Sequence, residues 1–346
     1  MADERTQYGG QAVVEGVMMR SPRFFAVACR KLSNGEIVTQ LEPVEKHLRG
    51  VQWLNKPFLR GSLALIDAMA MGIKALTYAA NVQAADDGSP PAPNSGGVRE
   101  ASAVNLALGE GIAEKEKSSN GTINGIAIGA TTVLSLFLGF GLFWTLPAIL
   151  ANKALHGYTS LAVNLAEGGI RLAIFFAYIT AISQMKHIQR VFQYHGAEHK
   201  AINTLEAGLP MTLENAQAAS RIHPRCGTNF IFIVLITSVF VFAIIPRNSL
   251  LEIIGLRLLL LPVVAGIAFE ILKWAGANRD KPWALALIAP GLWTQYLTTR
   301  VPEADQIEVA IAALDSVWAA EHDGATLTIS ALRTDKPDEE PAAAVA

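Results

Sequence analysis

The fold class follows from residues 250–274, which read LLEIIGLRLLLLPVVAGIAFEILKW. A helix needs about 20 apolar residues to cross the hydrocarbon core of a bilayer, and this stretch exceeds that length. Three further stretches have the same character: residues 123–150, 164–185 and 228–246. Hydrophobic residues make up 51% of the 346 residues and charged residues only 17%, and the apolar residues lie in long blocks. We therefore predict a mainly α-helical, polytopic membrane protein with about four transmembrane helices.

Two other apolar segments are expected to lie along the membrane or to enter it without crossing. Residues 282–299 are short and interrupted by Pro290 and Gly291, which indicates a re-entrant or interfacial segment. Residues 57–81 are predicted to form an amphipathic interfacial helix, because charged side chains interrupt the apolar ones: Arg60, Asp67 and Lys74.

The N-terminal part is predicted to be a small β unit over residues 7–56. Its clearest feature is a β-hairpin around Asn34-Gly35, since Asn-Gly is a strong hairpin signal. The preceding segment, GGQAVVEGVMMRSP, is rich in glycine and is expected to be a loop. Residues 82–121 are polar and rich in Pro, Gly and Ser, which predicts a disordered linker.

The remaining chain divides into three regions. Residues 122–302 are assigned to the transmembrane domain. Residues 303–322 are predicted to form an amphipathic helix, whose apolar stripe consists of Ile307, Ile311, Leu314 and Trp318. Residues 330–346, which end in KPDEEPAAAVA, are expected to be a disordered tail.

Basic residues indicate how the helices are oriented. The loop between the second and third predicted spans carries five of them, whereas the loops on the other side carry one each, Lys153 and Arg247. Because Lys and Arg accumulate on the cytoplasmic side, we expect both termini and the five-residue group to be cytoplasmic, with membrane lipids as partners. The net charge of −2 favours no nucleic-acid partner, and the N-terminus lacks the pattern of a cleaved signal peptide.

The densest group of chemical side chains follows the second predicted span, in QYHGAEHKAINTLEAG at residues 193–208. If that span continues as one helix to about Gly208, His195 and His199 lie on the same face, one turn apart. Two imidazoles at this spacing with a carboxylate between them are typical of a helix that binds Zn²⁺. In the order H-x-x-E-H, Glu198 is the candidate general base that acts on water at the metal. The alternative is a polar helix leaving the bilayer.

A second group, RIHPRCGTNF, comes just before the third span and is expected at the same membrane surface. His223 and Cys226 have chelating spacing there, so His223, Cys226 or Glu206 is predicted to complete the metal site. Cys226 as a small buried residue is the alternative. Cys29, in a predicted strand, is expected to be buried, and the two cysteines indicate no disulfide framework.

Four charged residues are candidates for binding a substrate. Glu15 and Arg20 lie on the glycine-rich loop, and Lys200 and Arg225 lie close to the two metal-binding groups. For Lys200 and Arg225, contact with lipid headgroups is the alternative.

Charges inside the predicted spans form another group. Glu167 and Arg171, four residues apart, are predicted to be an ion pair. Arg257 and Glu270 are candidates for lining a polar path.

Two functions other than an enzyme remain as alternatives. One is an ion channel or small transporter gated by the His/Glu cluster, which with four spans would need to be a homo-oligomer. The other is a membrane scaffold with a structural metal.

Four blocks of the sequence resemble the signature blocks of the YqhQ-like family. They are GGQAVVEGVMMRSP, RVFQYHGAEHKAINTLEAG, HPRCGTNF and PGLWTQYLTTR. The resemblance covers residues 7–80 and 122–302 and omits the polar insert and the tail. It implies a multi-pass protein of the bacterial inner membrane and a metal-dependent enzyme. Together with the H-x-x-E-H pattern, it predicts a hydrolase that acts at the cytoplasmic membrane surface with a divalent metal, zinc, as cofactor.

Overall fold

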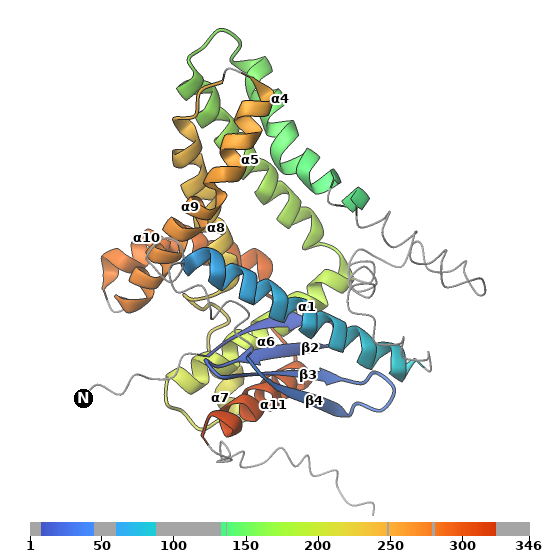
Figure 1. The fold of residues 1–346 in the computed structure, drawn as a ribbon. Helices are drawn as coiled ribbons and strands as arrows, with labels where there is room; N and C mark the ends of the chain where they lie inside the picture. The colour runs from blue at the N-terminus through green and yellow to red at the C-terminus, as the bar shows by residue number, and fades with distance from the viewer. Residues whose placement is uncertain are drawn as a thin grey trace, which may run out of the picture.

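The computed structural model describes residues 8–44, 60–87 and 133–322, apart from residues 136, 248, 279 and 280. Predictions for residues 45–56, 88–132 and 323–346 fall outside the described residues, including most of the linker and the whole tail. Figure 1 shows two parts, a tall group of helices and, at its foot, a unit built around a β-sheet.

The sheet consists of four antiparallel strands that follow the order of the chain. They are β1 (Gly9–Val13), β2 (Gly16–Arg20), β3 (Phe24–Arg30) and β4 (Ile37–Pro43). β3 and β4 form the predicted hairpin around Asn34 and Gly35. The loop prediction for the glycine-rich segment was wrong: β1 and β2 form a second hairpin there, with Glu15 in its turn at φ 51°. Glycines lower strand propensity, but the pairing of β1 with β2 and of β2 with β3 outweighs this preference.

Both faces of the sheet are covered by helices. Side chains alternate between the faces along a strand, so Val17 and Met19 lie on one face and Met18 on the other. The first face packs against α6 (Lys186–Glu206) and α11 (Ala304–Glu321). The second face packs against α1 (Arg60–Asp86), and Cys29 is buried on it as expected. Burying one large aliphatic side chain stabilises a fold by roughly 1.5–3 kcal/mol, so this two-sided core holds the helices on the sheet.

We call this assembly the sheet unit: β1 to β4, α1, α6, α7 (Leu213–Ala218) and α11. The sheet unit combines segments that come before, between and after the apolar helices in the chain. Its core therefore includes residues from three regions that were predicted to be separate: residues 7–56, 122–302 and 303–322. The helix predicted over residues 303–322 is α11. Three residues of its predicted stripe are almost fully buried against the sheet: Ile307, Ile311 and Leu314.

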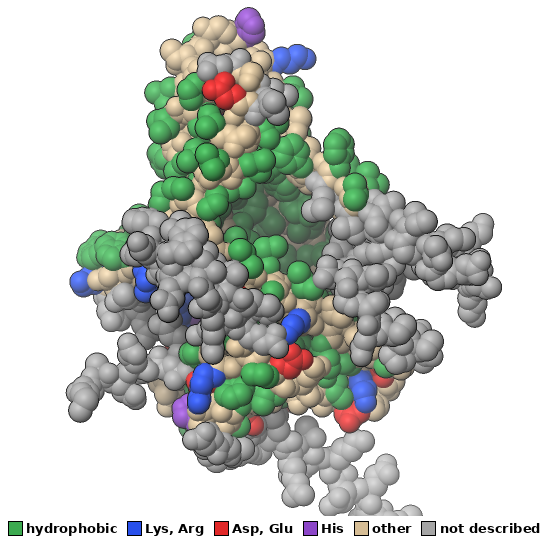
Figure 2. Space-filling model, in the orientation of Figure 1, with side chains coloured by type: hydrophobic (Ala, Val, Ile, Leu, Met, Phe, Trp, Pro, Cys, Tyr) green, Lys and Arg blue, Asp and Glu red, His purple; other side chains and the backbone are tan. Residues whose placement is uncertain are grey.

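The tall part consists of apolar helices. They are residues 133–154, which include η3 (Gly141–Thr145) and α4 (Leu146–Ala154), then α5 (Ser160–Ile182), α8 (Gly227–Ala243), α9 (Leu250–Ala277) and α10 (Pro282–Thr298). Figure 2 shows hydrophobic side chains over most of its surface, whereas charged side chains gather mainly on the lower part of the molecule. In the part of the chain that the structure describes, four helices are long and apolar enough to cross a membrane: Arg60–Asp86, Val133–Ala154, Ser160–Ile182 and Glu252–Ala275. The chain is therefore a membrane protein.

These four helices are not quite the four predicted spans. α1, expected at the interface, satisfies the length and composition of a span, while α8 has only 17 residues. The packing of α1 nevertheless ties it to the sheet, because Met71, Ala75 and Ala79 form a core with the sheet's second face. Figure 1 shows α1 running across the foot of the tall helices rather than along them.

Two predictions about helix continuity were wrong. The second apolar helix does not run on to Gly208: α5 ends at Ile182, residues 183–185 form a turn, and α6 starts a new direction along the sheet. Ser183 stabilises the turn, since its hydroxyl donates to the Thr180 carbonyl and its own carbonyl accepts from Arg300. α10 continues through Pro290 as one helix and is not broken there.

Candidate metal centre

Three potential metal ligands converge where the sheet unit meets the tall helices. His195 and His199 lie one turn apart on α6, and Cys226 is the N-cap residue of α8. One ligand atom from each lies within 4.8 Å of the other two. His195 Nε2 is 3.1 Å from Cys226 Sγ, and the two imidazole ring centroids are 4.5 Å apart.

The chain between α6 and α8 is fastened to α6, which brings Cys226 to the histidines. Lys200 Nζ donates to the carbonyls of Gln217 and Ala219, both at 2.6 Å. The Asn203 amide donates to two more carbonyls, those of Ser220 and Ile222. Because these bonds hold residues 217–222 alongside the helix, the chain can enter α8 only next to His195 and His199.

Both imidazoles are oriented so that their Nε2 atoms are available. His195 Nδ1 donates to the Thr298 carbonyl at 2.8 Å, and His199 Nδ1 donates to the Arg221 carbonyl at 2.6 Å. A carbonyl oxygen only accepts, so in the neutral rings Nδ1 carries the proton and Nε2 the lone pair. Metal-binding histidines have this arrangement, in which the second nitrogen donates to a fixed acceptor. His199 Nε2 is buried and has no hydrogen-bond partner among the described residues.

The ionisation of the donors also suits a cation. Burial lowers the pKa of His199, so its imidazole is neutral near pH 7. Burial alone disfavours a Cys226 thiolate, but the neighbouring His199 imidazole and the Thr228 hydroxyl and N–H outweigh it and lower the pKa of the thiol. A neutral imidazole and a thiolate are the forms in which these side chains bind metals.

Glu198 lies between this cluster and the sheet. Its side chain is buried, and the Gly10 N–H of β1 donates to the carboxylate. Any side chain at position 10 would meet the Glu198 carboxyl group, so glycine is required for this close approach. Burial raises the pKa of Glu198 to about 8, with His195 and Cys226 near enough to affect it. Its Oε2 atom has no hydrogen-bond partner among the described residues.

The other predicted ligands lie beside the three-donor cluster and are not part of it. The His223 ring is 5.8 Å from that of His199, and its Nε2 is 3.5 Å from Glu206 Oε2. Glu206 also forms an ion pair with Arg225. Gln295 holds the backbone of His223, accepting from its N–H and donating to its carbonyl. The structure therefore brings Cys226 to the histidine pair, while His223 and Glu206 form a neighbouring group.

The predicted substrate-binding residues make contacts within the protein. Glu15 forms an ion pair with Arg190 of α6 and accepts a hydrogen bond from the Tyr194 hydroxyl, which ties the β1–β2 turn to that helix. Partial burial lowers the pKa of Arg20, and the nearby Asp67 on α1 partly offsets this effect. Lys200 and Arg225 are held as described above. None of the four belongs to the three-donor cluster that the described residues form.

A different set of charges lies inside the tall helices. Glu167 and Arg171 form the predicted ion pair, at 2.7 Å. Arg247 and Arg257 bind the same carboxylate, at 2.9 Å and 2.5 Å. Glu270 instead pairs with Arg60 of α1. Because residues 257 and 270 are about 20 Å apart along α9 and belong to separate ion-pair groups, they do not line one path.

Comparison with known proteins identifies the family. Residues 56–320 match the family described as "Protein of unknown function (DUF1385)". The chain belongs to this family. It is also similar to "Uncharacterized protein YqhQ" of Bacillus subtilis (strain 168), with 36% identity over 317 residues, which cover 91% of this chain and 93% of the relative. This agrees with the resemblance carried by the four sequence blocks. No solved structure matches.

Several groups that complete the site in this DUF1385 protein were missed by sequence reasoning. The acceptors for the imidazoles are backbone carbonyls of Thr298 and Arg221, and a carbonyl has no signature in a sequence. A usable signal was Gly196, inside the H-x-x-E-H helix. A Cβ atom there would collide with the Arg300 carbonyl, so the glycine marks the contact between α6 and the segment after α10. The block PGLWTQYLTTR, noted only for its resemblance, supplies that segment.

Proposed function

We propose that this protein is a zinc-dependent hydrolase of the bacterial inner membrane, whose site faces the cytoplasm. The observation that carries the proposal is the meeting of His195 Nε2, His199 Nε2 and Cys226 Sγ within 4.8 Å, with both Nδ1 atoms fixed by backbone carbonyls. Three protein ligands of the His/Cys type are typical of catalytic zinc sites, which keep one coordination position open. Structural zinc sites more often use four protein ligands.

The unused donor atoms support a cation at this place. His199 Nε2 and Glu198 Oε2 are buried without partners among the described residues, and such atoms cost free energy unless something satisfies them. Zinc would be held by His195, His199 and Cys226. When bound, it supplies a Lewis acid that polarises a carbonyl or phosphoryl oxygen and makes water a better nucleophile at neutral pH.

Glu198 is proposed as the general base. Its carboxylate is adjacent to the ligands His195 and Cys226 in their electrostatic field, and Oε2 is free to take a proton. A raised pKa, about 8, suits a group that exchanges protons near neutral pH, and a nearby cation would lower that pKa. The Gly10 N–H donates to the carboxylate, and Oε2 is the oxygen without a hydrogen-bond partner among the described residues.

The location follows from charge and packing. Five basic residues lie on the segment that carries the site, so the positive-inside rule places the sheet unit in the cytoplasm together with both termini. Since the cluster lies where the sheet unit meets the apolar helices, the proposed substrate is associated with the membrane. Membrane lipids are the expected partners, and association of two or more copies remains part of the proposal.

A second candidate is a thiol hydrolase that needs no metal. One observation favours it: Cys226 Sγ lies 3.1 Å from His195 Nε2, and the other nitrogen of that ring is held by a carbonyl. A thiol, an imidazole and an orienting group are the parts of a cysteine nucleophile. Cys226 also lies at the N-terminus of α8, where the helix dipole favours a thiolate.

One pair of variants tests the role of Glu198. Glu198→Gln keeps the size of the side chain but removes the base, so it should retain zinc and lose hydrolysis of generic p-nitrophenyl ester and phosphodiester probes by about 100-fold or more. Glu214→Gln, an exposed glutamate on α7, is the matched control and should change neither. Loss of zinc in Glu198→Gln would make Glu198 a ligand. Hydrolysis that survives complete chelation would favour the thiol mechanism.

A further inference from the structure

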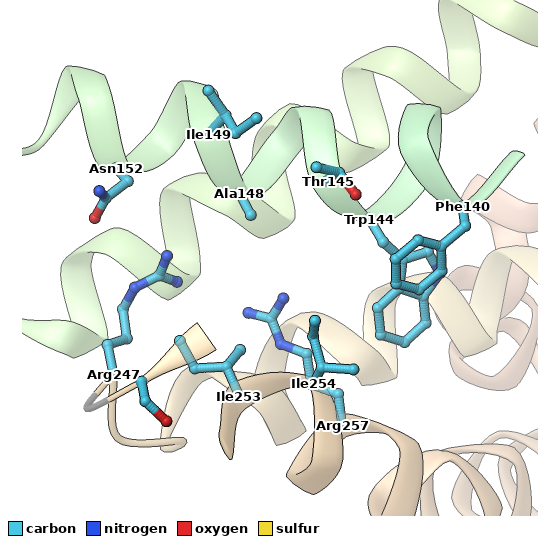
Figure 3. A pocket seen from close by; sticks show the side chains of 11 residues that line it. Phe140, Trp144, Thr145, Ala148, Ile149, Asn152, Arg247, Ile253, Ile254 and Arg257 are labelled. Carbon is cyan, nitrogen blue, oxygen red and sulfur yellow. The ribbon is translucent and has the colours of Figure 1, made fainter. Parts of the chain in front are cut away.

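A cavity opens among the tall helices, well away from the metal centre. Its volume is about 390 Å³, and it lies between residues 140–152 and the first turns of α9. Figure 3 shows two guanidinium groups, those of Arg247 and Arg257, pointing toward the side on which Ala148 and Asn152 lie. Most of the other lining is apolar, including Phe140, Trp144, Ile149, Ile253 and Ile254.

The charges at this cavity do not balance. The Glu167 carboxylate accepts hydrogen bonds from Arg171, Arg247 and Arg257, so one negative charge faces three positive charges. Two positive charges are therefore in excess within this group. None of the described residues that line the cavity is acidic.

The excess charge is buried, which makes it costly. The side chains of Arg171 and Arg257 are only 7% and 4% exposed, and that of Glu167 is 1% exposed. Arg257 uses both terminal nitrogens on Glu167, while its Nε atom is buried with no partner among the described residues. Charged groups within apolar helices are expensive unless a counter-charge neutralises them.

We propose that this cavity binds a phosphate-bearing anion, with Arg247 and Arg257 as the residues that attract it. Guanidinium groups bind phosphate oxygens through charge-assisted, often bidentate hydrogen bonds. The apolar walls suit the hydrocarbon that adjoins the phosphate in a phospholipid, while free phosphate would use the arginines alone. The inference is independent of the zinc site.

The cavity lies at the end of the tall helices that is remote from the sheet. Figure 1 shows α4 at the upper end and the sheet unit at the lower end, and Arg257 is only about 10 Å along α9 from its first residue. A phospholipid bound here would therefore belong to the membrane leaflet opposite the metal centre.

Thermal stabilisation of the delipidated full chain in detergent micelles tests the proposal. The probes are dioleoylphosphatidylglycerol, dioleoylphosphatidylcholine and sodium phosphate, each titrated separately. We expect saturable stabilisation by the net-anionic lipid and a much smaller effect of the zwitterionic lipid. If sodium phosphate stabilises the protein at the same concentrations, the ligand is free phosphate. If only the anionic lipid stabilises it, the ligand is the phospholipid.

Three variants connect the effect to the cavity. Arg247→Gln leaves Glu167 paired with Arg171 and Arg257, and should raise the half-saturating concentration about tenfold, the loss expected for one charge-assisted contact. Ala148→Phe fills the cavity without changing charge and should weaken binding similarly, so it carries the test if Arg247→Gln does not fold. Lys153→Gln removes an exposed positive charge from α4 outside the cavity and should bind as the wild type does.

Two results would overturn the proposal. One is equal stabilisation by the zwitterionic and the anionic lipid with no response to phosphate, because the excess positive charge would then have no effect. The other is the same half-saturating concentration in the wild type, Arg247→Gln and Ala148→Phe.

Discussion

The two polar groups of this protein differ in what they lack. In the membrane helices, three guanidinium groups surround the single carboxylate of Glu167, so the group has positive charge in excess. At the foot of those helices, the ligand atoms of His195, His199 and Cys226 meet beside the Glu198 carboxyl group, and this lone-pair cluster includes no Arg or Lys side chain among the described residues. One site is therefore suited to an anion and the other to a cation. By residue type alone, both groups are simply polar. Their charges and unpaired atoms show that one suits an anion and the other a cation.

The largest expected effect comes from removing the one negative charge of the membrane group. Glu167→Ala would remove the counter-charge of two buried arginines, Arg171 and Arg257, and of the partly buried Arg247, which should cost about 3–5 kcal/mol of stability. The measurement is thermal or denaturant unfolding in micelles. Glu214→Ala, on the exposed side of α7, is the control and should cost under about 1 kcal/mol. Similar losses in the two variants would show that the arginines do not depend on Glu167.

A smaller effect is expected from a glycine that supports the metal centre. Gly196→Ala places a methyl group against the Arg300 carbonyl, which should cost about 1–3 kcal/mol and displace the neighbouring Thr298 carbonyl from His195. Losing that orienting bond should weaken zinc affinity about 10- to 100-fold.

The matched control is Gly169→Ala on α5, where a Cβ atom has open space. It should be neutral or stabilising by up to about 1 kcal/mol, with zinc affinity unchanged. If both variants bind zinc with wild-type affinity, the Thr298 carbonyl does not orient a ligand.

The smallest effect is a change in thiol reactivity. Cys226 should resist iodoacetamide in the zinc-loaded protein and react at least about tenfold faster after chelation, because a metal-bound thiolate is protected. Since the pKa of its thiol is lowered, the reaction of the chelated protein should reach half its maximal rate below pH 9 and not above it.

Cys29 is the internal control for this measurement. Burial raises the pKa of its thiol to about 12, so it should stay unreactive with or without zinc. Peptide mass spectrometry distinguishes the two cysteines. Equal reactivity of Cys226 in the two states would remove it from the proposed coordination sphere.

Features encoded by short-range patterns could be predicted from the sequence. The apolar runs became the helices of the tall part, Asn34-Gly35 became a hairpin turn, and the stripe of Ile307, Ile311 and Leu314 became the buried face of α11. The Glu167–Arg171 pair, one helical turn apart, was predicted for the same reason.

Features that depend on distant contacts could not be predicted. The turn at residues 183–185 depends on Arg300, more than a hundred residues later, and it lets α6 leave the direction of α5 and pack on the sheet. Arg247 and Arg257 join Glu167 from beyond α8, 80 and 90 residues later in the chain. The orientation of His195 and His199 depends on hydrogen bonds to backbone carbonyls, which every residue has. The sequence therefore predicted the two histidines as ligands but not the carbonyls that orient them.

The central claim is that the lone-pair cluster holds zinc, and elemental analysis of the purified full chain tests it most directly. We expect about one equivalent of zinc per chain in the wild type, and less than about a tenth of that in His199→Ala and in Cys226→Ser, since each removes one of three ligands. His187→Ala removes an exposed histidine from the same helix and should retain the full equivalent. Zinc at the wild-type level in His199→Ala, or the same near-zero content in all four proteins, would contradict the claim.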